Sequence, residues 1–402
     1  MRQQLLLLLC GVVFVAASVL VSAAPAAAVA CEDVNDNGAC DGGEPLIPAA
    51  GGVFANPVLV TAGNTVTCPA PPFSTSIEAP KITVNGTVQC FFAGGAGVTL
   101  RSTGAGGIRI GPNAVVQAGG NGVVLQSATT IDVDHDAVIR GLANGSIVQL
   151  LAVGNITLTG TAASSVRIET PNQIVIQCTG NSCTFTAFFA ELFTAPGSGI
   201  VFITTDGDQT YGNVTVVAGT RIAVTSTHGA VLASGGGPDP CDAVVPFTIP
   251  AAAINNAADR DAWQAALAAA NPGKILQQLL DCLCFVQRGG QNVFRSSETG
   301  VIVFLAEDEV DLAGALILAG KLIQITSTLS FVGLVGADLE NTQTQGGALA
   351  GGGNIVLNSG TDTFIQAATL RDGGADFPNF DGVDTCGPVF PAGVIGVPTL
   401  CE

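Results

Sequence analysis

Short runs in which β-branched residues alternate with polar ones recur between Gly106 and Ser234. In each run two apolar residues stand two positions apart, so their side chains fall on the same face of a strand. Comparable pairs follow one another at intervals of about 18 to 25 residues, with Gly, Asn, Ser or Asp between them. A repeat of this length predicts a coiled β-solenoid rather than a set of independent sheets. The clearest pairs are Ile108/Ile110, Ile131/Val133, Ile156/Leu158, Val166/Ile168, Ile174/Ile176, Val214/Val216 and Ile222/Val224.

The composition supports a folded β structure with an aliphatic core. Hydrophobic residues make up 48% of the 402-residue chain, but aromatic residues make up only 5%, with one Trp and one Tyr. The core must therefore consist of Val, Ile, Leu and Ala, with Phe as the only plentiful aromatic. A pair of β-sandwich domains is the alternative, and it is disfavoured because such cores usually draw on Trp and Tyr. Since charged residues are only 11%, Thr, Ser, Asn, Gln and Gly must form most of the surface.

The first thirty residues predict export. After a positively charged start, an apolar stretch runs from Leu5 to Val21 and Ala-rich sequence continues to Ala30. This is the pattern of a secretory signal peptide, which we assign to residues 1–30; a retained anchor and lipidation of Cys31 are the alternatives. No later segment has enough uninterrupted apolar residues to span a bilayer. We therefore expect a mature chain that is secreted or held at the cell surface.

Of the 12 cysteines, all but Cys10 follow the expected signal peptide. In an exported chain they are interpreted first as disulfides. The pairs that lie close in sequence are Cys31/Cys40, Cys68/Cys90, Cys178/Cys183 and Cys386/Cys401. Cys241, Cys282 and Cys284 remain, which leaves one cysteine over; a zinc site at the last two is the alternative.

The charge balance restricts the partners. With 13 basic and 31 acidic residues, the formal net charge is −18. Such a chain will not bind nucleic acid or an anionic membrane surface by charge, and it will repel acidic polysaccharides unless metal ions intervene. Faces rich in Thr, Ser and Asn favour carbohydrate or a surface protein as the partner. The oligomeric state does not follow from the sequence.

Changes of composition divide the chain. Residues 49–105 are strand-like but interrupted by proline, which predicts an N-terminal cap over the first coil. Between Ala251 and Gln287 the sequence is Ala-rich with helical spacing and includes Trp263, so we expect a helical insertion there. The expected segments are a signal peptide (1–30), a calcium-loop and cysteine segment (31–48), a first solenoid block with its cap (49–235), the helical insertion (236–294), a second solenoid block (295–370) and an Asp-, Gly- and Cys-rich tail (371–402).

The strand-and-turn rhythm resembles the right-handed parallel β-helix of pectin-lyase-like and filamentous-haemagglutinin-like secreted proteins. The resemblance covers roughly residues 50–235 and 295–370, and rests on phrases such as GIRIG at 107–111 and GNITL at 154–158. It lies at the level of the fold, with no diagnostic motif. It implies an all-β chain folded as a parallel β-helix, to which the Ala-rich segment adds a small helical insertion. A solenoid carries no activity of its own.

Asp33 begins a segment that meets the full calcium-loop pattern D-x-[DN]-x-[DN]-G-x5-E. It resembles the loops of EF-hand, dockerin and thrombospondin type 3 modules, but Pro45 follows it directly and no helix flanks it. A disulfide between Cys31 and Cys40 would replace the missing helices, while Gly38 permits the sharp turn. Ca²⁺ takes six to eight oxygen ligands, and we expect a structural ion here; a merely acidic turn is the alternative. The expected ligands are the side chains of Asp33, Asn35, Asn37, Asp41 and Glu44 and the carbonyl of Ala39.

The best catalytic candidates alternate along one expected strand. Asp132, Asp134 and Asp136 would line one face, about 6–7 Å between neighbours, with Arg140 nearby. Paired carboxylates at that separation suit glycoside hydrolysis, and metal-bridged carboxylates suit uronate elimination. Pectin-lyase-like enzymes place such residues on an exposed face, but their polyanionic substrates need cations that this chain largely lacks. An outward-facing polar row explains the same residues.

The sequence thus favours an exported, calcium-stabilised β-solenoid that serves as a structural or adhesive element at the cell surface or outside the cell. The alternative is a β-helix enzyme, a lyase or glycoside hydrolase, that degrades polysaccharide with Asp132, Asp134 and Asp136.

Overall fold

A computed structural model describes residues 30–233, except 70–73 and 92–95, and residues 292–334, except 298. Beyond residue 334 it describes only short strands and their neighbours up to Cys386, and within the expected insertion only Ala265, Ala266 and Ala269, which are helical. Residues 1–29, most of the insertion with Trp263, most of the tail, and the expected partners Cys241, Cys282, Cys284 and Cys401 lie outside the described residues.

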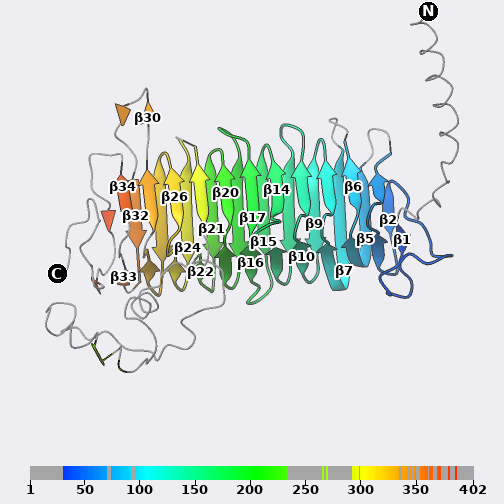
Figure 1. The fold of residues 1–402 in the computed structure, drawn as a ribbon, viewed down its shortest axis with the longest axis horizontal. Helices are drawn as coiled ribbons and strands as arrows, with labels where there is room; N and C mark the ends of the chain where they lie inside the picture. The colour runs from blue at the N-terminus through cyan, green and yellow to red at the C-terminus, as the bar shows by residue number, and fades with distance from the viewer. Residues whose placement is uncertain are drawn as a thin grey trace, which may run out of the picture.

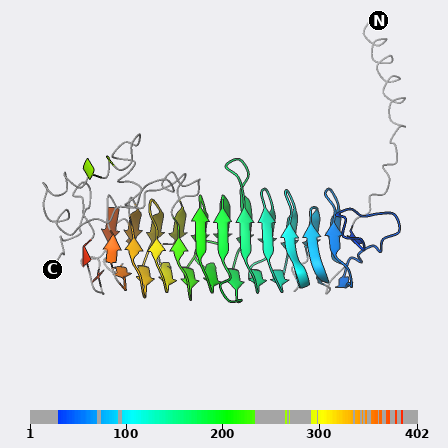
Figure 2. The ribbon, with the colours of Figure 1, turned by 90° about the horizontal axis from the view of Figure 1, so that it is seen from below.

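The molecule is an elongated parallel β-solenoid (Figures 1 and 2). Each coil contributes three strands, and equivalent strands of successive coils pair in parallel to form three ladders. The first ladder contains β2 (Gly51–Val53), β5 (Thr75–Val84), β7 (Gly97–Ile110), β9 (Gly122–Ser127), β12 (Ile147–Ala152), β15 (Gln173–Cys178), β18 (Ile200–Thr205), β21 (Arg221–Ser226), β24 (Val301–Ala306), β27 (Leu322–Ser327), β32 (Asn354–Asn358) and β35 (Asn379–Phe380).

The second ladder joins the first in one 23-stranded sheet, because β5 and β7 run through both. Its further strands are β3 (Val58–Val60), β10 (Ile131–Asp134), β13 (Ile156–Thr159), β16 (Phe185–Phe188), β19 (Gln209–Gly212), β22 (Val231–Leu232), β25 (Val310–Asp311), β28 (Val332–Gly333), β33 (Asp362–Phe364) and β36 (Thr385–Cys386).

The third ladder is an 11-stranded sheet. It contains β4 (Thr65–Thr67), β6 (Thr87–Cys90), β8 (Val115–Ala118), β11 (Val138–Gly141), β14 (Val166–Thr170), β17 (Ala190–Thr194), β20 (Thr215–Ala218), β23 (Val293–Ser296), β26 (Leu316–Ala319), β29 (Asp338–Asn341) and β34 (Thr369–Asp372). A short antiparallel hairpin, β30 (Thr344–Gln345) with β31 (Ala348–Leu349), stands apart from the ladders. Among the described residues, no helix has the length and hydrophobicity that crossing a membrane requires.

Side-chain alternation explains why these segments stack. Leu100, Leu125 and Leu150 occupy the same inward position of three consecutive coils, and all three are fully buried. Each such Leu contributes about 1.5–3 kcal/mol by leaving water. A slip of one residue would turn every inward side chain outward, so the hydrophobic pattern fixes the register.

The predicted repeat mixed two spacings. Ile131 and Ile156 are true equivalents in neighbouring coils. Val166 and Ile174, however, lie on β14 and β15, so they belong to different ladders from Ile156. The shorter intervals therefore separate strands that follow one another along the chain, and only the intervals near 25 residues separate successive coils.

The N-terminal cap is shorter than expected. Strands β2 to β7, which the sequence analysis assigned to a cap over residues 49–105, already pair in parallel with the following coils. The segment that covers the first coil is instead β1 (Cys31–Glu32), which pairs antiparallel with β3. The described prolines of this segment lie between strands, as Pro57 and Pro69 do, or at the bulge of β5, as Pro80 does, so the ladders continue.

The second solenoid block begins at Val293 and continues the coil that Leu232 leaves. β22 pairs with β19 and β23 pairs with β20, and β19 and β20 are successive strands of the preceding coil. β22 and β23 are therefore successive strands of the next coil. Buried Asn292 closes the junction. Its Oδ1 accepts the N–H of Val214 at 2.9 Å, and its Nδ2 donates to the carbonyls of Tyr211, at 3.2 Å, and Ala233.

Near this junction the aliphatic core contains a row of four aromatic side chains. The rings of Phe185, Tyr211, Phe294 and Phe304 follow one another edge to face, with centroids 5.5, 5.6 and 4.9 Å apart. The Tyr211 hydroxyl donates to buried Gln209 at 2.6 Å, and burial raises the pKa of Tyr211 well above its usual value. The only Tyr of the chain is thus a neutral core residue whose hydroxyl is satisfied.

Three of the expected disulfides are present. Cys31–Cys40, Cys68–Cys90 and Cys178–Cys183 have Cα–Cα distances of 5.7, 5.1 and 6.0 Å. Each joins cysteines that are close in sequence, as the spacing predicted. The first fastens the N-terminal loop, the second joins two successive coils beside the β4–β6 pair, and the third closes the turn between β15 and β16.

Candidate functional site

The N-terminal loop folds around Asp33, which is buried. The two oxygens of its carboxylate accept the N–H of Asn37, at 3.1 Å, and of Gly38, at 2.9 Å. Gly38 has φ 77°, so the sharp turn that the motif requires is present at the glycine. The local sequence thus forms a closed loop around its first aspartate.

Three more of the expected ligands meet on one side of this loop. The amides of Asn35 and Asn37 both donate to Asp41 Oδ2, at 3.0 and 2.7 Å. These two hydrogen bonds lower the pKa of Asp41, so its carboxylate stays ionised. The Oδ1 atoms of the same asparagines accept the N–H groups of Asn37 and Ala39, at 3.1 and 2.8 Å.

Glu44 closes the loop at its far end. One of its oxygens accepts the N–H of Val34 and the other that of Asp41, both at 2.9 Å. The Cys31–Cys40 disulfide and the antiparallel β1 hold the same loop against β3. These restraints take the place of the flanking helices that the sequence lacks.

The loop brings expected ligands together without forming a cluster of acids. Where the structure describes the chain, no three His, Cys, Asp or Glu side chains lie close enough to hold a metal ion between them. Asp33, Asp41 and Glu44 each accept N–H donors instead. A calcium ion would have to replace the amide donors on Asp41, and the oxygens of the same amides would then serve as ligands.

Of the catalytic candidates, Asp132 and Asp134 point outward from β10. Arg109, one coil earlier on β7, donates to Asp134 Oδ2 through Nε at 2.9 Å and through its terminal Nη2 at 2.8 Å. Asp132 accepts the hydroxyl of Thr130 at 3.2 Å. Asp134 is therefore neutralised by an ion pair, whereas no cation of the described chain pairs with Asp132.

The predicted row of three aspartates comprises only two. β10 ends at Asp134, and Asp136 lies in the following turn with φ 57°, so it does not share their face. Arg140 lies on β11 in the third ladder, where its Nε donates to Gln117 Oε1 at 2.6 Å. The four residues do not form one site, because the turn at Asp136 carries the chain from one sheet to the other.

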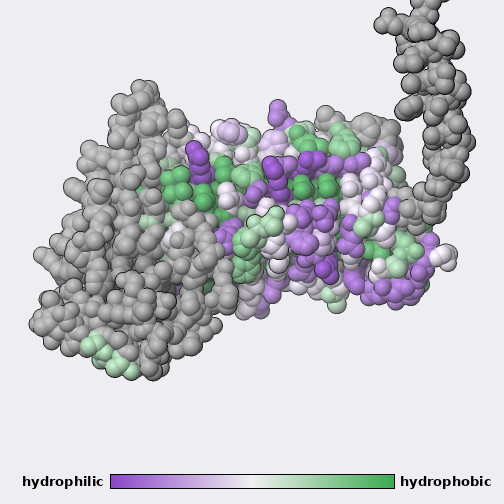
Figure 3. Space-filling view, in the orientation of Figure 1, coloured by the Kyte–Doolittle hydropathy of each residue, from purple (hydrophilic) through white to green (hydrophobic). Residues whose placement is uncertain are grey.

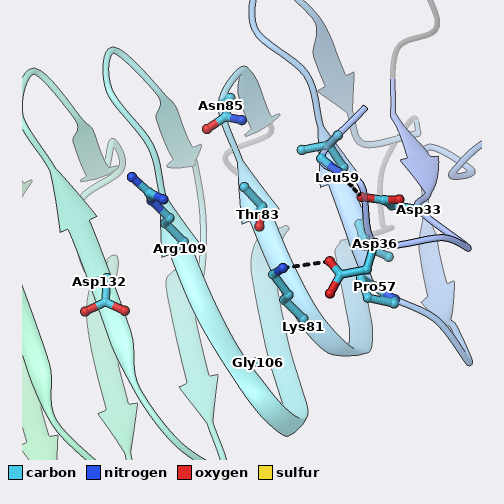
Figure 4. Close-up of a pocket in the computed structure, with 12 residues that line it drawn as sticks. Asp33, Asp36, Pro57, Leu59, Lys81, Thr83, Asn85, Gly106, Arg109 and Asp132 are labelled. Carbon is cyan, nitrogen blue, oxygen red and sulfur yellow. Dashed lines mark hydrogen bonds and ion pairs between the residues drawn. The ribbon is translucent and has the colours of Figure 1, made fainter. Parts of the chain in front are cut away.

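A groove joins the N-terminal loop to the outward face of the second ladder (Figure 4). Its volume is about 430 Å³. Asp33 and Asp36 of the loop line one side and Asp132 the other, while Lys81 and Arg109 lie between them. Lys81 Nζ pairs with Asp36 Oδ1 at 2.7 Å, so the loop is tied to β5 across the groove.

The register of the strands determines the wall of this groove. Leu59, Thr83, Arg109 and Asp132 are consecutive partners in the second ladder. They are far apart in sequence, and sequence reasoning missed Lys81 and Thr83 altogether. The sequence indicates only that each of these residues points outward from its own strand. It does not indicate which strands pair with one another, so it could not bring these residues together.

A second polar group lies at the corner between the first and second ladders. The Nδ1 atom of His228 lies 2.6 Å from Asp206 Oδ1, and this hydrogen bond raises the pKa of the exposed His228. A backbone N–H from Ser182, together with His228, lowers the pKa of Asp206. One coil further on, partial burial and the charge of Asp308 raise the pKa of Glu309. Asp206 thus joins the turns that carry Ser182 and His228.

No protein-family model, no curated protein and no solved structure matches this chain.

Proposed function

We propose that this chain is exported and serves as a structural or adhesive element at the cell surface or outside the cell. One observation carries the proposal: outward side chains, including a row of polar ones on the third ladder, are held in register over successive coils around one continuous apolar core. The three disulfides support an oxidising compartment, since reduced compartments rarely keep such bonds.

The third ladder illustrates how the surface is fixed. Gln89 donates to Thr67 and Gln117 donates to Gln89, both at 3.0 Å. Arg140 extends this row by donating to Gln117, and its Nη1 atom lies 3.8 Å from Oε1 of Glu169 on the next coil. On the face shown in Figure 3, hydrophilic and hydrophobic residues intermingle over the described coils. Because neighbours hold these side chains, a partner meets a preorganised surface and loses less conformational entropy on binding.

Fractionation of cells that express the full chain tests this proposal. We expect the chain in the medium or at the surface, shortened at its N-terminus, with its disulfides oxidised. Cells that display it should adhere to coated surfaces more strongly than cells that lack it. A full-length, reduced chain in the cytosol would contradict the proposal.

We also propose that one calcium ion stabilises the N-terminal loop. The side chains of Asp33, Asn35, Asn37, Asp41 and Glu44 and the carbonyl of Ala39 would hold it. What supports this is their convergence in one closed loop that already includes an ionised carboxylate. When bound, the ion supplies a shared partner for carboxylates that now depend on separate N–H donors.

Calorimetric titration with calcium tests the loop. Asp33→Ala and Glu44→Gln should each abolish one binding site. Asp36→Asn is the matched control, because Asp36 lies in the same loop at a position that the motif does not use as a ligand. Unchanged titration of the first two variants would refute calcium binding here.

A further inference from the structure

The groove beside the N-terminal loop offers hydrogen-bonding groups but no unpaired cation. Lys81 is engaged by Asp36 at 2.7 Å and Arg109 by Asp134 at 2.8 Å. In the described part of the chain no cation pairs with Asp132. The groove therefore presents a carboxylate, that of Asp132, whose recorded partner is the hydroxyl of Thr130 and not a cation, and both cations of the groove are already neutralised.

Such a lining selects against acidic ligands. Three aspartates line the groove against two cations, and the whole chain has a net charge of −18. An anion would have to displace Asp36 or Asp134 from its partner, and the field of the chain would oppose its approach. A neutral ligand with hydroxyl donors avoids both costs, because Asp132 accepts hydroxyl groups directly.

The floor of the groove adds an apolar surface. Pro57, Val58 and Leu59 line it; because Val58 and Leu59 are almost completely buried, the half-buried Pro57 offers the apolar surface. The C–H faces of a sugar ring suit such a floor, while Thr83 and Asn85 at its side offer a hydroxyl and an amide. The volume of about 430 Å³ lies within the range of small-ligand sites, roughly 300–1,000 Å³.

The outward row continues beyond the groove. After Asp132 the next partners in the second ladder are Thr157, Thr186 and Thr210, one on each successive coil. Neighbouring strands lie about 4.7–4.9 Å apart, so the three hydroxyls form a line of regular spacing along the axis. A polymer of hydroxylated units can follow this line, whereas a single sugar would use only the groove.

We propose that the groove binds a neutral polysaccharide whose chain continues along Thr157, Thr186 and Thr210. The proposal deepens the adhesive function and rests on it, because it names the ligand class and the surface that would adhere. Asp132 accepts sugar hydroxyls, and Pro57 contacts the ring.

Affinity electrophoresis of the full chain tests this inference. Native gels at constant calcium contain either a neutral β-glucan, mannan or xyloglucan, or one of the acidic polymers polygalacturonate and alginate. We expect at least one neutral polymer to retard the chain and neither acidic polymer to do so. Asp132→Asn and Thr83→Ala should each raise the dissociation constant obtained from the retardation about tenfold or more, which corresponds to about 1.4 kcal/mol or more of binding free energy.

Asp308→Asn is the matched control, because it makes the same charge change on a distant exposed turn. Circular dichroism confirms that each variant is folded. The inference is overturned if no neutral polymer retards the chain, if an acidic polymer binds more tightly, or if Asp132→Asn behaves as Asp308→Asn does. Surface location is measured separately. A surface-held chain without glycan binding refutes this inference alone, whereas a cytosolic chain refutes the adhesive function.

Discussion

Asn292 is the residue whose removal should most disturb the junction between the two solenoid blocks. Its side chain is 1% exposed and makes three hydrogen bonds, to Val214, Tyr211 and Ala233. Asn292→Ala removes all three, at about 1 kcal/mol each, and leaves the buried N–H of Val214 unpaired, which costs about 1–3 kcal/mol. The carbonyl groups of Tyr211 and Ala233 can shift after the substitution and recover part of this cost. We therefore expect the free energy of unfolding to fall by about 3–5 kcal/mol in total.

Hydrogen exchange is the appropriate assay, since a solenoid is stabilised by nearest-neighbour contacts and can open locally. A loss of about 3 kcal/mol corresponds to roughly a hundredfold faster exchange. The acceleration should be confined to β20, β23 and their partners, and distant strands such as β9 should be unchanged. The denaturant midpoint should fall as well.

Asn144→Ala provides the control, because Asn144 lies on an exposed turn where a substitution changes stability by less than about 0.5 kcal/mol. If exchange at Val214 and Val293 were as slow in Asn292→Ala as in Asn144→Ala, the argument that Asn292 closes the junction would fail.

Three further perturbations test the packing of the core, the Cys68–Cys90 disulfide and the hydrogen bond between His228 and Asp206. Leu125→Ala should destabilise the chain by about 2–5 kcal/mol in denaturant unfolding, and a loss below 1 kcal/mol would contradict close packing between coils. Replacing Cys68 and Cys90 by Ala opens a cross-link of 22 residues and should cost about 3 kcal/mol, with no further sensitivity to reductant at that site. Because Asp206 raises the pKa of His228 above 6.5, the pair stabilises the fold below that pH, and the contribution is lost as pH rises through the raised pKa. Asp206→Asn should lower the pKa of His228 in an NMR titration; an unchanged pKa would show that Asp206 is not its cause.

Much of the fold follows from alternation alone. The segments around Ile108, Ile131 and Ile156 predicted both the strands and their coiled repeat. In each of them apolar and polar residues alternate with a period of two, which assigns side chains to the inward and outward faces of a strand. The disulfides also followed from spacing, since cysteines on one turn or on adjacent coils are close along the chain. The extent of the cap did not follow, because proline between strands looks the same whether the strands cap the stack or belong to it.

The candidate site was only half predictable. The loop from Asp33 to Glu44 is contiguous, so its motif is visible, and the structure does close it around Asp33. The groove is not contiguous: Lys81, Arg109 and Asp132 meet only because parallel pairing sets the register of three coils. Asp136 was misplaced because the end of β10 depends on where the chain turns to the next sheet.

By itself, the sequence determined the class of architecture, the aliphatic core and the loop that closes on its own carboxylates, since each depends on residues near one another along the chain. Only the tertiary structure decided which outward residues are neighbours, where the stack begins at β1, and how Asn292 resumes it after the insertion. The physical reason is that the ladders pair residues some 25 positions apart, and the hydrogen bonds of parallel strands are indifferent to side chains. Register, and with it every surface row and groove, is therefore set by the packing of the whole core.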